Sequence, residues 1–174
     1  MESHGLNLIY ETAEAQDGYF STVQAEMVGI SRHTLAKAAS RGKLLRISRA
    51  VYRLAKYPEM SSNSHLWAAV LWPQVRTRIS AILSHHTALL LHNLSDVNAE
   101  QVHLTIPRTL RIVRNAPDSL VLHHANLLKH EVTYVDGLPI TTMERTLRDI
   151  AALGETLLLH DALRDARSRN LPIP

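Results

Sequence analysis

Polar and apolar positions in the first 57 residues predict three short helices. Residues 5–16 read as the first helix. Ser21, with Gln24 three positions later, predicts a capping box at the start of the second. Ser31 is the expected N-cap of the third, shortly after Gly29 ends the second. Two short helices joined by a few residues around a glycine are typical of a helix-turn-helix.

The third helix, expected over residues 32–41, has two faces of different chemistry. With about 100° per residue, one face is small and apolar and is predicted to pack inward; it consists of Thr34, Leu35, Ala38 and Ala39. The opposite face has cations, small residues and hydrogen-bonding groups: Arg32, His33, Ala36, Lys37 and Ser40, with Arg41 at its edge. A solvated helix face usually includes Asp or Glu for pairing along the helix. Their absence favours a surface that meets phosphates and base edges.

A period-two pattern follows directly after this helix. The stretch "KLLRISRAVYRL" predicts two short strands around Ser48 and Arg49. A hairpin after the second helix of the motif would make it a winged helix-turn-helix. Arg46, Arg49 and Arg53 would then place cations on the wing.

The charge distribution supports this interpretation. Eight of the 19 Lys and Arg residues lie between Arg32 and Lys56, a window without Asp or Glu, which leaves 11 basic and 16 acidic residues elsewhere. A basic block in an otherwise acidic chain is the electrostatic footprint of a nucleic-acid partner, because clustered cations release counterions from a polyphosphate. The alternative, from charge alone, is a solvated basic face.

A polar segment with proline and serines, "YPEMSSNS" at residues 57–64, is the expected domain boundary. We therefore expect a winged-helix domain over residues 1–57 and a mixed α+β domain over residues 64–174. The fold class is α+β.

The C-terminal part mixes helical and strand signals. Helices are expected over residues 65–73, after Ser84 as N-cap, after a capping box of Thr141 and Glu144, and over about residues 155–169. The stretches "QVHLTIPR" and "SLVLHHA" predict strands on either side of "RTLRIVRNAPD", a basic loop or hairpin tip. "EVTYVDGLPIT" predicts a hairpin with an Asp-Gly turn.

Composition limits the remaining classes. The chain has no cysteine, so disulfides and thiolate zinc sites are excluded. No apolar run reaches the roughly 18 residues that span a bilayer, and no signal peptide is expected at the N-terminus. The expectation is a cytoplasmic protein without a membrane partner.

Histidine is the one residue type that suggests other chemistry. The chain has 11 histidines, among them His85, His86 and His92, and the pair His123 and His124. A metal site built from them is an alternative, but no His-x-x-x-His or His-Glu-x-x-His spacing is present. There is also no phosphate-binding glycine loop. We expect no enzyme activity, no cofactor and no metal.

Residues 18–54 resemble the N-terminal winged-helix domain of the AbiEi family of type IV toxin–antitoxin antitoxins. Members of this family typically read Gly-x-Phe-Thr-x-x-Gln-Ala, then Gly-Ile-Ser, a basic helix, and a Gly-Val-Tyr-Arg wing; the chain has "GYFSTVQA", "GIS" and "AVYR". "LSHHTALLLHNLSD", "VHLTIPR", "LVLHHA" and "DGLPITTMERTLRDIA" also follow the family's order, up to about Leu163. Ala50 departs from the pattern at the position of the wing glycine, and since alanine tolerates positive φ poorly, a different wing turn is expected.

The resemblance implies a DNA-binding transcriptional autorepressor and antitoxin. Its partners would be double-stranded DNA of its own promoter, with inverted repeats, and a cognate nucleotidyltransferase-like toxin. The alternative is a protein-binding module that neutralises a toxin, with DNA binding only accessory. The residues expected to contact DNA are Ser31, Arg32, His33, Lys37, Ser40, Arg41, Lys43, Arg46, Ser48, Arg49 and Arg53.

Overall fold

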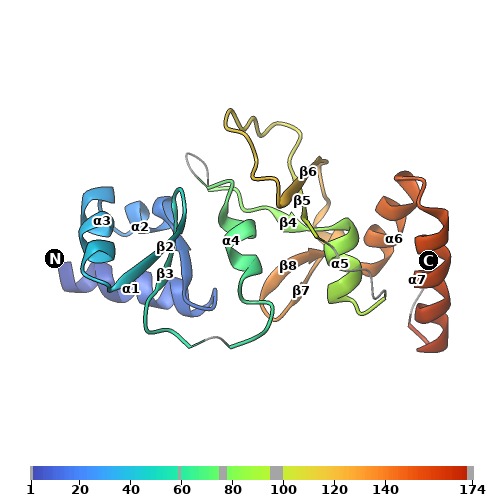
Figure 1. Cartoon of the computed structure of the whole chain (residues 1–174), viewed down its shortest axis with the longest axis horizontal. Coiled ribbons are helices and arrows are strands. Elements are labelled where there is room, and N and C mark those ends of the chain that lie inside the picture. The colour runs from blue at the N-terminus through green and yellow to red at the C-terminus, as the bar shows by residue number, and fades with distance from the viewer. Residues whose placement is uncertain (1, 59, 75–77, 95–99, 172–174) are drawn as a thin grey trace. The chain divides into compact units, whose positions relative to one another are not determined.

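The computed structural model describes residues 2–58, 60–74, 78–94 and 100–171, with side chains from residue 8 onward. The architecture is mixed α+β, as expected (Figure 1). Contacts divide the chain into two compact units, residues 1–81 with 136–138, and residues 82–135 with 139–174. No helix within the described ranges combines the length and the apolar character needed to cross a bilayer.

Two helices of the first unit begin at the expected caps, α2 (Thr22–Met27) and α3 (Arg32–Ser40). They follow α1 (Glu2–Glu14), which was expected over residues 5–16. Ser21 and Gln24 form the predicted capping box of α2, and the Ser31 side chain accepts a hydrogen bond from the backbone N–H of Thr34. These local signals were sufficient because each satisfies backbone donors that a helix start leaves without intrahelical partners.

The strands of the first unit form a sheet in the order β1-β3-β2. Its members are β1 (Tyr19–Ser21), β2 (Leu44–Ser48) and β3 (Val51–Leu54), and both pairings are antiparallel. The β2–β3 hairpin was predicted, whereas β1 was not, because its three residues overlap the helix-start signal at Ser21. Pairing with β1 makes β3 the central strand, and all four of its residues are buried.

One apolar core holds these elements together. Phe20 from β1, Leu35 from α3 and Tyr52 from β3 belong to it, together with Ile9 and Ala13 from α1. Gly18 precedes β1 with φ of +85°, and a Cβ at this position would lie 2.8 Å from the side chain of Tyr57. A side chain therefore has no room at Gly18, which explains why a glycine joins α1 to the sheet.

The first unit continues beyond the boundary expected at residues 57–64, of which residue 59 lies outside the described residues. All six residues of helix α4 (Leu66–Leu71) are apolar, and five of them are buried. The Ser21 hydroxyl donates a buried hydrogen bond of 2.6 Å to Oε1 of Gln74. These contacts place α4 and the residues after it in the same compact unit as β1. The division into independent domains 1–57 and 64–174 stays a prediction.

The second unit contains a five-stranded sheet in the order β6-β5-β4-β8-β7. Its strands are β4 (Ile82–Leu83), β5 (Val102–Ile106), β6 (Leu120–His124), β7 (Val132–Val135) and β8 (Leu138–Thr141), with the short η1 helix (Lys129–Glu131) before β7. β5 and β6 are parallel, so the basic segment between them is a loop and not a hairpin tip. Asp136 and Gly137 form the predicted turn, with φ of 50° and 78°.

Three helices complete the second unit: α5 (His85–Leu91), α6 (Met143–Ala152) and α7 (Thr156–Ser168). Leu89, Leu147 and Ala162, one from each helix, are buried in a common cluster. The N-cap of α6 is Thr142, so the predicted capping box of Thr141 and Glu144 is wrong by one residue. Thr141 instead ends β8 and bonds to the hydroxyl of Thr146 over 2.7 Å.

Candidate functional site

Helix α3 has an inner and an outer face, and their residues are close to those predicted. Leu35 is buried, and Ala38 and Ala39 are partly buried against the core. Thr34 was expected on the inner face but is exposed, and its hydroxyl lies 3.0 Å from that of Ser31. Thr34 therefore lies at the edge of the inner face, where it lines a small cavity with Leu35 and Ala38.

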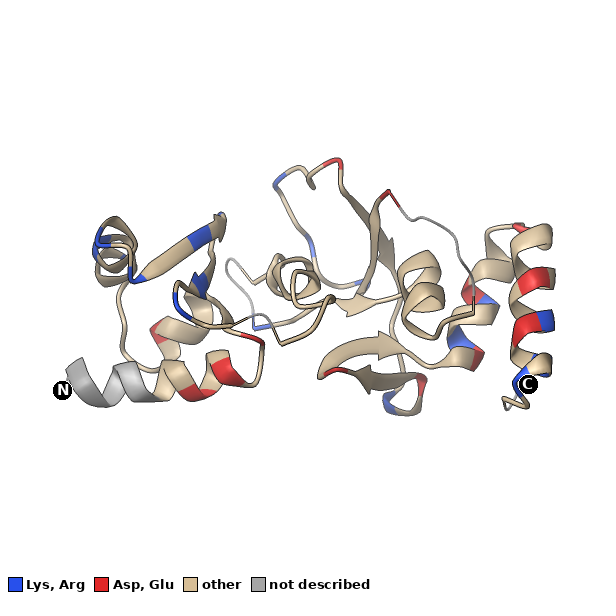
Figure 2. Ribbon diagram, turned by 60° about the horizontal axis from the view of Figure 1, so that its bottom comes forward, with Lys and Arg blue, Asp and Glu red and all other residues tan. Residues whose placement is uncertain are grey.

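The outer face of α3 is exposed and has no acidic residue of its own. Its exposed members are Arg32, His33, Ala36, Lys37 and Ser40, followed by Arg41. Figure 2 shows basic residues on α3 and on the β2–β3 hairpin, whereas acidic residues lie on α1. In the first unit, basic and acidic residues thus lie mainly on different helices and strands.

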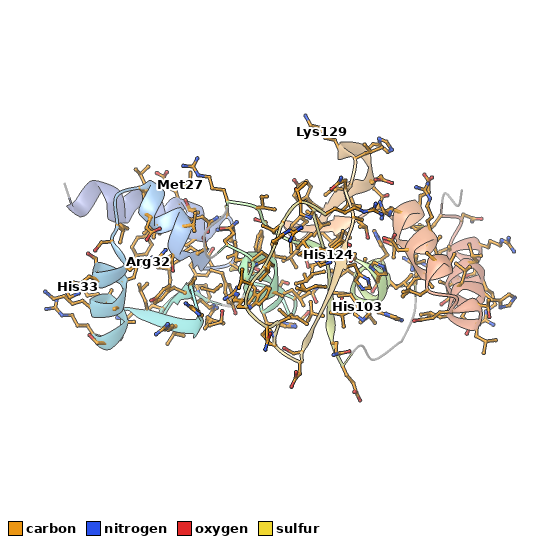
Figure 3. All side chains as sticks on the ribbon, turned by 90° about the horizontal axis from the view of Figure 1, so that it is seen from above. Met27, Arg32, His33, His103, His124 and Lys129 are labelled. Carbon is orange, nitrogen blue, oxygen red and sulfur yellow. The ribbon has the colours of Figure 1, made fainter. Side chains whose placement is uncertain are left out.

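Arg32 has an acidic partner from the preceding helix. Its Nε donates a hydrogen bond of 2.6 Å to Oε1 of Glu26 in α2. The hydrogen bond and the negative charge of Glu26 both raise the pKa of the Arg32 guanidinium, which therefore stays a cation. Both side chains remain substantially exposed, at 61% for Arg32 and 41% for Glu26. Figure 3 labels Arg32 and its neighbour His33 on α3.

The β2–β3 hairpin adds a second group of exposed cations. Lys43, Arg46 and Arg49 are exposed, and Ser48 is half-buried. Ala50 in the turn has φ of +76°, a left-handed conformation that favours glycine over alanine. Its carbonyl accepts a hydrogen bond of 2.8 Å from the backbone N–H of Thr22. This bond links the turn to the first residue of α2.

Arg53 differs from the other expected DNA contacts because it is buried, with 8% of its surface exposed. Its Nη2 donates to the carbonyl oxygen of Tyr57 over 3.0 Å, and its guanidinium lies over the ring of Tyr19, 5.4 Å from the centroid. The sequence could not indicate this environment, because it depends on β1 covering the other side of β3. Arg53 therefore supports the sheet and does not extend the exposed basic surface.

The expected site residues thus fall into three groups. Nine are exposed on α3 or the hairpin: Ser31, Arg32, His33, Lys37, Ser40, Arg41, Lys43, Arg46 and Arg49. Ser48 is half-buried and Arg53 is buried. The nine exposed residues are called the basic surface below.

The histidines of the second unit lie in different environments. His85 and His86 lie beside His103 and His123, whereas His92 bonds separately to the carbonyl oxygen of Thr141. His124 is exposed. His103 joins the two histidine segments, and the sequence had indicated it only as a polar position of a strand.

A comparison with protein families matches residues 7–55 to the family described as transcriptional regulator, AbiEi antitoxin. The resemblance to the AbiEi family is confirmed for this segment. The AbiEi segment runs from within α1 to the residue after β3, and so contains the complete basic surface. A comparison with curated proteins gave no significant match.

Proposed function

We propose that the AbiEi segment is a winged helix-turn-helix that binds double-stranded DNA, and that the protein represses its own promoter. The observation that carries this proposal is the basic surface, which gathers exposed cations from α3 and the β2–β3 hairpin within a segment that matches a family of transcriptional regulators. Repression at inverted repeats and a cytoplasmic location belong to the same proposal. No catalytic step is part of it.

In the proposed complex, the first turns of α3 enter the major groove. Arg32, His33 and Lys37 face the base edges there, and the long cations suit the O6 and N7 acceptors of guanine. Arg41, Lys43, Arg46 and Arg49 neutralise phosphates and fix the position of the helix along the duplex. Arg53 has no role in these contacts because it is buried under β1.

The test is binding of the full chain to its own promoter over a range of salt concentrations. Lys37→Ala and Arg49→Ala should each weaken binding, and loss of one phosphate contact should reduce the slope of log K against log salt by about 0.9. Lys129→Ala is the matched control, an exposed lysine outside the AbiEi segment (Figure 3). Promoter binding that is unchanged in both test variants would overturn the proposal.

We further propose that the protein acts as an antitoxin toward a nucleotidyltransferase-like toxin through its second unit. The supporting observations are the antitoxin description of the matching family and large apolar side chains exposed on this unit, including Leu157 at 82% and Tyr134 at 69%. The full chain with Lys37→Ala should still rescue cells that express the toxin, although it should no longer repress the promoter. If the Lys37→Ala variant failed to rescue the cells, this would show that toxin neutralisation depends on DNA binding.

A further inference from the structure

Four imidazole rings meet in the second unit, outside the AbiEi segment. His85 and His86 open α5, His103 lies on β5 and His123 on β6. One ring nitrogen from each of His85, His103 and His123 lies within 4.8 Å of the other two. The rings of His85 and His123 are stacked, with centroids 3.5 Å apart and planes inclined by 13°. Figure 3 labels His103 among the strands of this unit.

The spacing of the nitrogens matches that required by a small tetrahedral cation. Nε2 of His123 lies 3.2 Å from Nδ1 of His103, and Nδ1 of His86 lies 3.3 Å from the same atom. In a tetrahedral zinc site with Zn–N bonds of about 2.0–2.1 Å, two ligand nitrogens are about 3.3–3.4 Å apart. His103 and His123 therefore already have the nitrogen separation of a ligand pair. His85 is stacked on His123, so its ring would have to turn out of the stack to direct a nitrogen at the same ion.

Neighbouring groups fix which nitrogens point into the cluster. Nδ1 of His85 lies 2.9 Å from the hydroxyl of Ser84, which also accepts a hydrogen bond from Thr105. Nε2 of His86 lies 2.6 Å from the carboxylate of Glu155, to which it donates. A carboxylate behind a histidine ring fixes the tautomer and raises the basicity of the opposite nitrogen, as is usual around bound metals.

Burial affects the ionisation of these rings. Burial, followed by the charges of neighbouring histidines, lowers the pKa of His85 to about 3. Burial is also the main cause that lowers the pKa of His103, to about 4, and the pKa of His123. The cluster therefore disfavours a positively charged imidazolium, whether or not an ion is bound.

We propose that His85, His103 and His123 form a binding site for a divalent transition-metal ion of the zinc type, with His86 and Glu155 beside it. An imidazole set without thiolates suits zinc, copper, nickel or cobalt, and it is a poor match for magnesium or calcium, which prefer oxygen ligands. Three protein nitrogens leave the fourth position of a tetrahedral ion for water or another ligand. This site goes beyond the proposed DNA binding and does not depend on it.

The competing interpretation is a hydrogen-bonded histidine network without an ion. In that network, one of the two facing nitrogens of His103 and His123 carries a proton. Binding of an ion requires that this proton move to the other nitrogen of its ring, so the ring stays neutral and no proton is lost. The two interpretations therefore differ in ring tautomer as well as in metal content.

A bound ion would join three elements that are distant in sequence. His85 begins α5 with φ of +52°, a left-handed conformation that is uncommon outside glycine. This backbone turns the imidazole into the cluster, while β5 and β6 present theirs from neighbouring parallel strands. Metal binding should therefore raise the thermal stability of the chain.

The experiment uses the full chain without a histidine tag, stripped with a chelator and titrated with Zn²⁺. The expected result is uptake of one ion per chain and a higher melting temperature, with Co²⁺ giving the visible absorption of a tetrahedral site. Long-range ¹H–¹⁵N spectra should show a change of tautomer in a cluster histidine. A stripped protein that takes up no stoichiometric Zn²⁺ overturns the proposal.

Variants assign the ion to these residues. His103→Gln and His123→Gln should each abolish stoichiometric uptake, because both remove a proposed ligand nitrogen. His124→Gln is the matched control, because it changes the next residue on β6 but is exposed and outside the set. Circular dichroism checks the folding of each variant. If His103→Gln does not fold, His123→Gln and the wild-type spectra decide. Uptake that is unchanged in folded His103→Gln or in folded His123→Gln overturns the assignment.

Discussion

Arg32 at the start of α3 is held by Glu26 of α2, with 2.6 Å between Nε and Oε1. The pair joins the two helices of the proposed DNA-binding motif at its exposed side. It also places one negative charge next to a residue that is proposed to meet bases. The free protein therefore has a competitor for the DNA at this position.

Replacing Glu26 with glutamine should strengthen DNA binding. Glu26→Gln removes the charge that competes for Arg32, and since the pair is largely exposed, the gain should be modest, up to about fivefold at low salt. Fluorescence anisotropy with the promoter duplex measures this change.

The double variant identifies the cause of the gain. If Glu26 acts through Arg32, the gain should shrink when Glu26→Gln is made in an Arg32→Ala background. An equal gain in both backgrounds would show that Glu26 repels phosphates directly and that Arg32 is not its target. Weaker binding by Glu26→Gln alone would contradict the prediction.

A glycine at position 50 should stabilise the protein. Ala50 has φ of +76°, where a Cβ is unfavourable by about 1–2 kcal/mol, while glycine loses more chain entropy on folding. The net gain of Ala50→Gly should be about 1 kcal/mol, which corresponds to about 2–4 °C in melting temperature for a chain of this size. Urea unfolding and thermal melts measure it.

Ala36→Gly is the matched control for this prediction. Ala36 is exposed in the middle of α3, where glycine should destabilise by about 1 kcal/mol. The two substitutions are chemically identical and should have opposite signs. A loss of stability in Ala50→Gly would mean that the turn tolerates the Cβ without strain.

Much of the first unit was predictable because its signals are local. The caps at Ser21 and Ser31 and the β2–β3 hairpin each depend on residues within a few positions of one another. The exposed cations of α3 were predicted from the helical periodicity of residues 32–41. Ala50 has a left-handed backbone despite its Cβ, and its carbonyl accepts a hydrogen bond from the backbone N–H of Thr22. The difference from the family's turn stays a prediction.

Contacts between distant segments could not be predicted in this way. The burial of Arg53 requires β1 to pair with β3, which brings Tyr19 opposite Arg53. The histidine cluster requires the parallel pairing of β5 with β6, which sets His103 beside Val121 and places it two rows from His123. The spacing of these residues along the chain does not indicate either strand pairing. The search for a His-x-x-x-His pattern therefore could not find the histidine cluster.

A buried ion-pair network on α6 provides a test of stability in the second unit. Arg145 bonds to both Glu131 and Asp149, at 3.1 and 2.8 Å, and all three side chains are at most 15% exposed. Arg145→Met should leave two buried carboxylates without this partner and destabilise the chain by about 3 kcal/mol. Urea unfolding at neutral pH measures the change.

Arg164→Met is the corresponding control on the surface. Arg164 pairs with Asp161 at 3.0 Å, but its side chain is 64% exposed. Its removal should change the free energy of unfolding by less than about 1 kcal/mol. Similar losses in the two variants would show that burial does not strengthen the α6 network.

His92 should make the protein sensitive to mild acid. Its Nε2 donates a hydrogen bond of 2.8 Å to the carbonyl oxygen of Thr141, and burial lowers its pKa below the ordinary 6.5 despite that bond. The unfolded chain therefore binds a proton at His92 at a higher pH than the folded chain does. The stability associated with neutral His92 is present above pH 6.5 and decreases as the pH falls below that value.

His92→Gln should remove this sensitivity, because the glutamine amide can donate to the same carbonyl but does not titrate. The variant should be about as stable as the wild type at pH 7.5 and more stable than the wild type at pH 5.5, by urea unfolding at both pH values. His160→Gln, at a histidine whose side chain is 75% exposed, is the control at the surface. If the stability difference between His92→Gln and the wild type is the same at both pH values, protonation of His92 does not oppose folding, and the hydrogen bond to Thr141 must offset its burial.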